Sequence, residues 1–169
     1  MSFSVHATSE LALMGASAAL LFGANVGFGA IARETARRAK ALGMEVVAHD
    51  PYLRAEDPAW TEHGVQPVGL DELLETADAV SLHVPLTDRT HHLIGAQALA
   101  RMRSDAVLVN AARGGVVDEA ALAAALRAGR PGAALLDVFE QEPLPAGSPL
   151  EGAPNLILTP HIAGVTQES

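Results

Sequence analysis

A glycine turn between an apolar segment and a helix constrains this chain more than any other stretch. Gly27-Phe28-Gly29-Ala30-Ile31-Ala32 has the pattern Gly-x-Gly-x-x-Ala, a permitted form of the dinucleotide-binding fingerprint. Glycine allows backbone conformations and close approaches that a Cβ would block. A helix that starts here directs N–H groups and the positive end of its dipole towards an anion. The turn therefore predicts a phosphate-binding loop that includes Gly27, Gly29, Ala30 and Ile31.

Apolar strands alternate with helices along the rest of the chain. We expect helices at residues 31–42, 71–76, 95–102 and 118–128. We expect strands at residues 45–49, 79–84, 106–110, 133–138 and 156–159. Gly43 and Gly129 are placed to end helices, and Asp118 is placed to cap one. The alternation predicts an α/β fold, a Rossmann-like doubly wound parallel sheet with helices on both faces.

The beginning of the chain carries weaker signals. Residues 9–14 have a helical pattern with Ser9 as a cap. We expect the strand that enters the glycine turn at residues 20–26, although Gly23 and Asn25 interrupt it. These patterns divide the chain into a helical segment, residues 1–22, and one dinucleotide-binding domain, residues 23–169.

Composition and charge exclude several classes of protein. The chain has 169 residues, of which 49% are apolar, and this excludes a disordered chain and allows one domain with a core. A net charge of −9 argues against nucleic-acid and anionic-membrane partners. The lack of cysteine excludes thiol catalysis and disulfides, and fits a reducing, cytoplasmic compartment. Residues 11–32 are uncharged, but no basic residue precedes them, so they indicate a buried helix and strand rather than a membrane span.

The residues that follow each strand are the candidates for a site, because ligands bind beyond the carboxyl ends of parallel strands. Asp50 ends the second strand, about twenty residues after the glycines, where a carboxylate binds the adenosine ribose. A carboxylate repels a 2′-phosphate, so Asp50 favours NAD over NADP. The alternative is an ordinary strand-end aspartate in front of Pro51.

Arg113 and His161 follow two further strands. Arg113 lies between small residues, where its guanidinium can bind a carboxylate with two hydrogen bonds; the alternative is a surface arginine. Histidine titrates near neutral pH, as a general acid–base requires. Two acids, Glu140 and Glu142, are candidates to pair with His161.

Other histidines indicate no metal site. His83 is expected to contribute its backbone rather than its ring. His91 and His92 are adjacent, so they do not face the same way on a helix, and no third ligand is evident. Signatures of P-loop nucleotidases and of α/β-hydrolases are missing from the sequence.

Five stretches together resemble the D-isomer-specific 2-hydroxyacid dehydrogenases. That family includes phosphoglycerate, D-lactate and sulfolactate dehydrogenases and hydroxypyruvate reductases. The resemblance covers roughly residues 26–169 and is carried by residues 27–31, 81–87, 108–118, 136–143 and 159–164.

The resemblance implies an NAD-dependent enzyme that transfers hydride between NAD(H) and a 2-hydroxy acid/2-oxo acid pair. Arg113 would hold the carboxylate and keto oxygen of the 2-oxo acid. His161 would donate a proton to that oxygen, and Glu142, preferred to Glu140 by motif position, would pair with His161. Asp137 would lie near the nicotinamide amide. The remaining residues implied to line the cofactor are His83, Val84, Pro85, Ala112, Arg113, His161 and Gly164.

Members of the family also have a substrate-binding domain, and no stretch of these 169 residues is expected to form it. The resemblance therefore implies a cofactor domain cut from a larger enzyme, or a degenerate gene product. Because the family dimerises through this domain, we expect a homodimer. The alternative function is a catalytically inactive NAD-binding or interaction module derived from the family.

Overall fold

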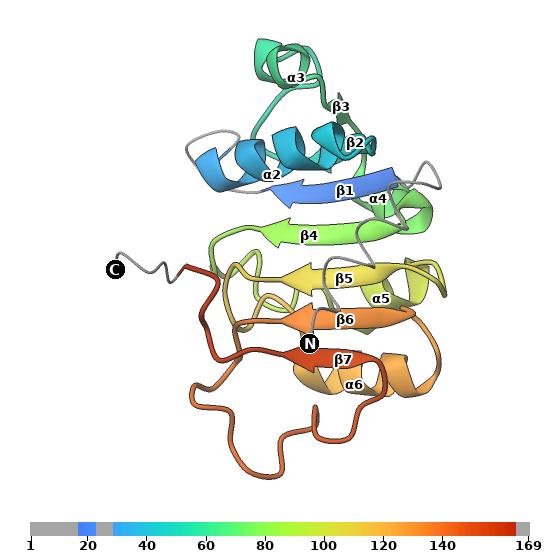
Figure 1. The fold of residues 1–169 in the computed structure, drawn as a ribbon, viewed down its shortest axis with the longest axis vertical. Helices are drawn as coiled ribbons and strands as arrows, with labels where there is room; N and C mark the ends of the chain where they lie inside the picture. The colour runs from blue at the N-terminus through green and yellow to red at the C-terminus, as the bar shows by residue number, and fades with distance from the viewer. Residues whose placement is uncertain (1–16, 23–28, 165–169) are drawn as a thin grey trace.

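A seven-stranded parallel sheet forms the centre of the molecule. The computed structural model describes residues 17–22 and 29–164. The strand order is β3-β2-β1-β4-β5-β6-β7, and all neighbouring strands pair in parallel. All carboxyl ends therefore lie at one edge of the sheet (Figure 1). The strands are β1 (Ser17–Phe22), β2 (Glu45–His49), β3 (Gln66–Pro67), β4 (Ala79–His83), β5 (Val107–Asn110), β6 (Ala133–Leu136) and β7 (Leu156–Leu158).

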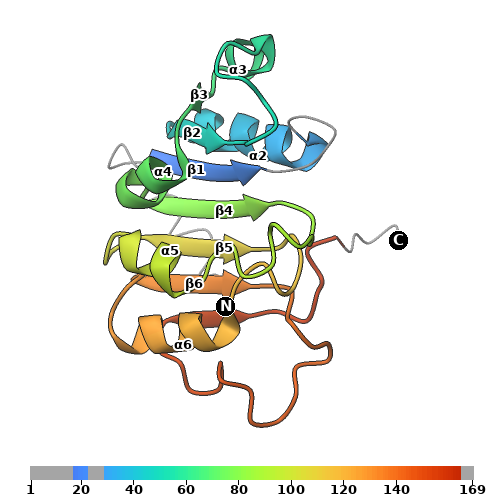
Figure 2. The same cartoon turned by 180° about the vertical axis from the view of Figure 1, so that it is seen from behind.

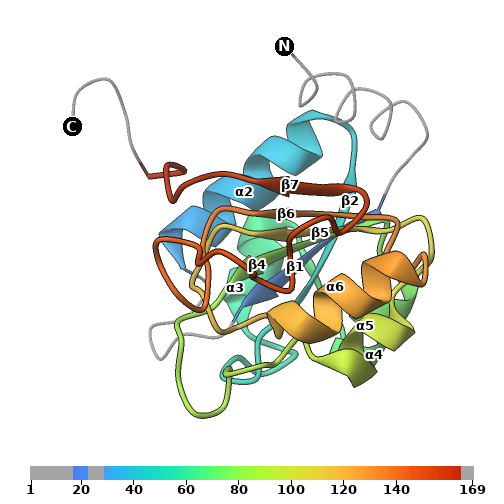
Figure 3. The same ribbon diagram turned by 90° about the horizontal axis from the view of Figure 1, so that it is seen from below.

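Helices cover both faces of this sheet. Figure 3 shows α2 on one face and α4, α5 and α6 on the other, and Figure 2 shows these three in front of the sheet. The predicted doubly wound α/β fold is confirmed. The helices are α2 (Ala30–Ala41), α3 (Pro58–His63), α4 (Leu70–Thr76), α5 (Ala96–Arg101) and α6 (Glu119–Arg127).

Local signals explain where these helices begin and end. The Asp118 side chain caps α6 by accepting a hydrogen bond from Ala121 N at 2.8 Å, as predicted. Gly43 follows α2 with φ +84°, a left-handed conformation that glycine adopts without strain. The buried residues of α2 are alanines, which let the helix approach the sheet closely.

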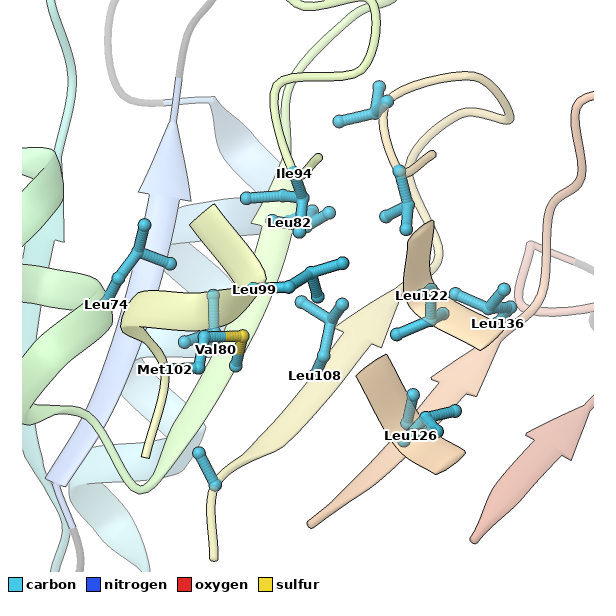
Figure 4. Close-up of a cluster of buried hydrophobic side chains, with 14 of the residues drawn as sticks. Leu74, Val80, Leu82, Ile94, Leu99, Met102, Leu108, Leu122, Leu126 and Leu136 are labelled. Carbon is cyan, nitrogen blue, oxygen red and sulfur yellow. The ribbon is translucent and has the colours of Figure 1, made fainter. Parts of the chain in front are cut away.

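The largest apolar cluster lies between the sheet and α4, α5 and α6. Leu82 of β4, Leu108 of β5 and Leu136 of β6 point into this layer, and Leu99 of α5 and Leu122 of α6 meet them (Figure 4). All five are at most 1% exposed, and burial of each side chain contributes about 1.5–3 kcal/mol. The core thus fixes the strand ends that carry the candidate site residues.

The prediction for the first strand was confirmed only in part. The described strand is Ser17–Phe22, which pairs with β2 and β4 in the middle of the sheet and begins three residues before the predicted start at residue 20. The last four residues of the predicted strand, 23–26, lie outside the described residues. The sheet therefore begins within the segment 1–22 that we expected to be helical. The helix expected at residues 9–14, and Asn25, lie outside the described residues.

Neither α3 nor β3 was predicted from the sequence. Asp57 caps α3 by accepting a hydrogen bond from Ala59 N, Pro58 is its first residue, and Gly64 ends it with φ +59°. The α3 helix lies at the β3 end of the sheet (Figures 1 and 2). No helix in the described part of the chain is long and apolar enough to cross a membrane.

Candidate functional site

The N-terminus of α2 opens into a cavity at the carboxyl edge of the sheet. The cavity has a volume of about 380 Å³ and brings together most residues that the sequence predicted to bind a cofactor. The first N–H groups of a helix have no partner within it and can bind an anion here. Gly27 lies outside the described residues. The cavity is lined by Gly29, Ala30, Ile31, Ala32, His83, Val84, Pro85, Ala111, Ala112 and Arg113.

Asp50 carries a buried oxygen that needs a ligand. The residue is 5% exposed, and its Oδ1 accepts a hydrogen bond from Tyr52 N at 2.9 Å. Its Oδ2 is buried and has no hydrogen-bond partner among the described residues. Burying such an oxygen without a partner costs about 1–3 kcal/mol. A ribose hydroxyl would satisfy it, so the residues present fit the adenosine end of NAD.

Arg113 is presented by a loop that Asn110 holds. Asn110 is 1% exposed, its Nδ2 donates to Arg113 O at 3.0 Å, and its Oδ1 accepts from Ala112 N at 3.1 Å. The Arg113 side chain is exposed, and its Nη1 donates to Ala112 O. The backbone is therefore fixed while the guanidinium can reach a ligand. The sequence feature that could have indicated this role of Asn110 is its position as a polar residue at the end of an apolar strand.

The structure pairs His161 with Glu142 and not with Glu140. His161 Nδ1 lies 2.7 Å from Glu142 Oε2, and Glu142 Oε1 accepts a hydrogen bond from Phe139 N at 3.0 Å. The hydrogen bond from His161, followed by the one from Phe139, holds the pKa of the Glu142 carboxyl below its usual value. Glu140 instead contacts His92. The pair also lines a largely apolar cavity of about 390 Å³. The other residues that line it are Phe139, Pro143, Leu144, Leu158, Thr159 and Pro160.

Asp137 holds the segment that carries His161. It is 2% exposed, and it accepts hydrogen bonds from Thr159 Oγ1 at 2.5 Å, Ile162 N at 3.0 Å and Ala163 N at 2.8 Å. Burial raises the pKa of the Asp137 carboxyl, but these hydrogen bonds outweigh it and the pKa lies below its usual value. His161 has φ +54°, which is uncommon for a residue with a Cβ. The sequence did not suggest this positioning role of Asp137, or its bond to Thr159.

Asp137 and Gly164 remain predicted cofactor contacts. Gly164 is exposed, three residues beyond His161, at the end of the described chain.

His91, His92 and His83 make contacts that do not involve the His161–Glu142 pair. The rings of His91 and His92 stack with centroids 3.9 Å apart. Within residues 17–22 and 29–164, no group of side chains is suited to hold a metal ion. His83 Nε2 lies 3.0 Å from Ser81 Oγ. Burial lowers the pKa of His83 from 6.5 to about 4, so its ring is neutral at pH 7.

Folding stability is expected to fall as the pH falls from 6.5 to about 4, because His83 binds a proton more readily in the unfolded state. The shift corresponds to about 2–3 kcal/mol across this range. His83→Gln, which keeps a polar partner for Ser81, should flatten the dependence. Urea denaturation at pH 7 and pH 4.5 measures both proteins, with His63→Gln as the control. An equal loss of stability in the wild type and His83→Gln would contradict the assignment.

Comparison with known proteins identifies the family of this chain. The family model described as D-isomer specific 2-hydroxyacid dehydrogenase, NAD binding domain, matches residues 13–163. The chain belongs to the D-isomer specific 2-hydroxyacid dehydrogenases. The resemblance inferred from the five sequence stretches is thereby confirmed.

Three relatives illustrate this family. The chain is 60% identical over 144 residues to an (S)-sulfolactate dehydrogenase of Chromohalobacter salexigens, covering 85% of this chain and 46% of that protein. The structure of a glyoxylate reductase from Paecilomyes thermophila superimposes with a TM-score of 0.79 and 40% identity, covering 91% of this chain and 44% of the other. The structure of a D-lactate dehydrogenase with NAD+ from Lactobacillus jensenii superimposes with a TM-score of 0.76 and 34% identity, covering 89% of this chain and 47% of the other. The chain thus spans less than half the length of these relatives.

Proposed function

We propose that this chain is the NAD-binding domain of a 2-hydroxyacid dehydrogenase and supplies its catalytic side chains. The observation that carries the proposal is the 2.7 Å contact between His161 and Glu142. It lies at the carboxyl edge of the sheet, where Arg113 and the N-terminus of α2 also lie. An acid–base pair, a carboxylate-binding cation and an anion-binding helix end are what reduction of a 2-oxo acid requires.

Each side chain has a separate task in this reaction. When bound, NADH supplies the hydride. Arg113 binds the carboxylate and the keto oxygen of the 2-oxo acid. His161 donates a proton to that oxygen and takes it back in the oxidative direction. Glu142 accepts the Nδ1 hydrogen of His161, which orients the ring and leaves Nε2 to transfer the proton.

The donor set at the other end of the site suits NAD. The buried Oδ2 of Asp50 is available to a ribose hydroxyl, and a carboxylate at this position disfavours the 2′-phosphate of NADP. The pyrophosphate is expected at the N-terminus of α2. Val84 and Pro85 line the same cavity as Ala112 and would contact the cofactor between these two ends.

The substrate belongs to the class of small 2-hydroxy and 2-oxo acids. The 60% identity to an (S)-sulfolactate dehydrogenase makes sulfolactate and its 2-oxo acid the first candidates. We place the protein in the cytoplasm, a location consistent with its lack of cysteine. We also propose a homodimer, because the described surface leaves large apolar side chains exposed at Ile157 and Ile162, outside the cofactor cavity.

NADH titration followed by fluorescence, and a screen of 2-oxo acids for NADH oxidation, test the proposal. We expect NADH to bind more tightly than NADPH, and Asp50→Asn to weaken NADH binding about tenfold, the usual effect of losing a charged hydrogen bond. Asp57→Asn, at the cap of α3, is the control. We expect turnover with the 2-oxo acid of sulfolactate where the site is closed by the rest of the protein.

The outcomes separate the two candidate functions. Turnover that depends on His161 supports the dehydrogenase. NADH binding without turnover, in a preparation that contains every domain of the protein, favours the inactive NAD-binding module. A chain that binds no NADH would contradict both.

A further inference from the structure

Two loops that carry the proposed site meet at the first turn of α6. We propose that Glu119 is a positioning residue that couples the Arg113 loop to the Glu142–His161 pair. The inference rests on the proposed function, because it concerns the geometry of the same site. Glu119 follows Arg113 by six residues and begins α6, whereas Glu142 lies in the turn that follows β6.

Reciprocal hydrogen bonds join these two segments. Glu140 N donates to Glu119 Oε1 at 2.7 Å, and Glu119 N donates to Glu140 Oε1 at 3.1 Å. Each glutamate therefore binds the backbone of the other. Glu140 lies between Phe139, whose N–H binds Glu142 Oε1, and Glu142 itself. The position of Glu140 N thus sets the turn from which Glu142 reaches His161.

The burial of Glu119 argues that this contact has a purpose beyond helix capping. An acid in the first turn of a helix interacts favourably with the helix dipole while fully exposed to solvent. Glu119 is 7% exposed, and burial is the main cause that raises the pKa of its carboxyl. Burying a carboxylate costs free energy, which its hydrogen bond to Glu140 N partly offsets.

Two neighbouring contacts hold the same junction. A Cβ added to Gly114 would lie 1.7 Å from Phe139 O, so the Arg113 loop packs directly on the turn that carries Glu142. His92 Nε2 lies 3.1 Å from Glu140 Oε1, and His92 Nδ1 lies 3.8 Å from Asp118 Oδ2. Glu119 is the buried member of this junction that bonds to the backbone of the turn. Its loss is therefore expected to release Glu142.

Titration of the Glu142 carboxyl by NMR in the full chain tests the role of Glu119. His161→Asn marks the pKa of a Glu142 that has lost its partner, because the hydrogen bond to His161 is the main cause that lowers it. In Glu119→Ala we expect the pKa of Glu142 to rise by at least half of the rise seen in His161→Asn. Removing a neighbouring negative charge would by itself lower the pKa of Glu142, so a rise reports a lost position.

Matched variants separate position from charge and from folding. Glu119→Gln keeps an acceptor oxygen for Glu140 N and should restore the low pKa of Glu142. Glu119→Asp keeps the charge and the helix dipole interaction but is one methylene too short, so it should raise the pKa. This variant decides the question if Glu119→Ala does not fold. Glu75→Ala, which removes an exposed ion pair between Glu75 of α4 and Arg101 of α5, should change nothing.

The results that would overturn the inference differ from those that would overturn the proposed function. If the pKa of Glu142 stays unchanged in both Glu119→Ala and Glu119→Asp while it rises in His161→Asn, Glu119 has no positioning role. Equal titrations in Glu119→Ala and Glu119→Gln would also contradict it. If His161→Asn leaves the pKa of Glu142 unchanged, the acid–base pair itself is wrong.

Discussion

Replacing His161 with asparagine is expected to slow reduction of the 2-oxo acid by about 10²–10⁴-fold, the usual contribution of a general acid. Asparagine has no imidazole ring and does not donate a proton at neutral pH. NADH binding should stay unchanged, because the proposed phosphate and ribose contacts lie at α2 and Asp50. Steady-state kinetics and NADH titration on the protein that contains all its domains measure both quantities.

His63→Asn is the matched control for this experiment. His63 is the last residue of α3, which lies at the β3 end of the sheet and away from β7 (Figure 1). We expect its variant to retain the wild-type rate. A His161→Asn protein that turns over normally would remove His161 from the mechanism. A loss of NADH binding would show that the predicted contact of His161 with the cofactor, and not proton donation alone, accounts for the slower rate.

Replacing Gly114 with alanine is expected to cost about 3 kcal/mol of folding stability, at the upper end of the usual cost of overpacking. The added Cβ would lie 1.7 Å from Phe139 O and 2.3 Å from Phe139 C. Both are backbone atoms, so no side-chain rotation relieves the clash. The Arg113 loop and the turn that carries Glu142 would have to separate, and catalysis should fall with stability.

Gly69→Ala is the control for the stability measurement. Gly69 precedes α4 with φ −68°, and nothing lies within 4 Å of the Cβ that alanine would add. Urea denaturation should therefore give a small change for Gly69→Ala and a large one for Gly114→Ala. Similar midpoints for the two variants would show that the contact at Phe139 relaxes freely.

Much of the fold could be predicted because its signals are local. The cap at Asp118 and the stop at Gly43 act within a few residues of themselves, and both were confirmed. The start of the first strand was misplaced by three residues because a central parallel strand has no alternation of polar and apolar residues to mark where it begins. The Asp57-Pro58 pair that begins α3 is also a local signal, although α3 was not among the predicted helices.

The candidate site was only partly predictable, because its local signals can be read from the sequence whereas contacts between distant segments cannot. Arg113 and His161 could be found because each follows an apolar strand, and parallel strands bring their carboxyl ends together. The motif position favoured Glu142 over Glu140, and the structure agrees with that choice. The bonds between Glu119 and Glu140 could not be predicted, because they join segments 21 residues apart through the packing of α6 beside the turn.

The strands that precede Arg113 and His161 differ in how many neighbouring strands hold them in the sheet. Arg113 follows β5, which has a hydrogen-bonded neighbour on each side, whereas His161 follows β7, a three-residue strand at the edge of the described sheet. Edge segments open locally at a lower free energy than interior strands. The loop that carries Arg113, the proposed substrate-binding cation, is therefore held by an interior strand. His161, the proposed proton donor, instead depends on the hydrogen bonds of Asp137 to Thr159, Ile162 and Ala163 to keep its place at the edge of the sheet.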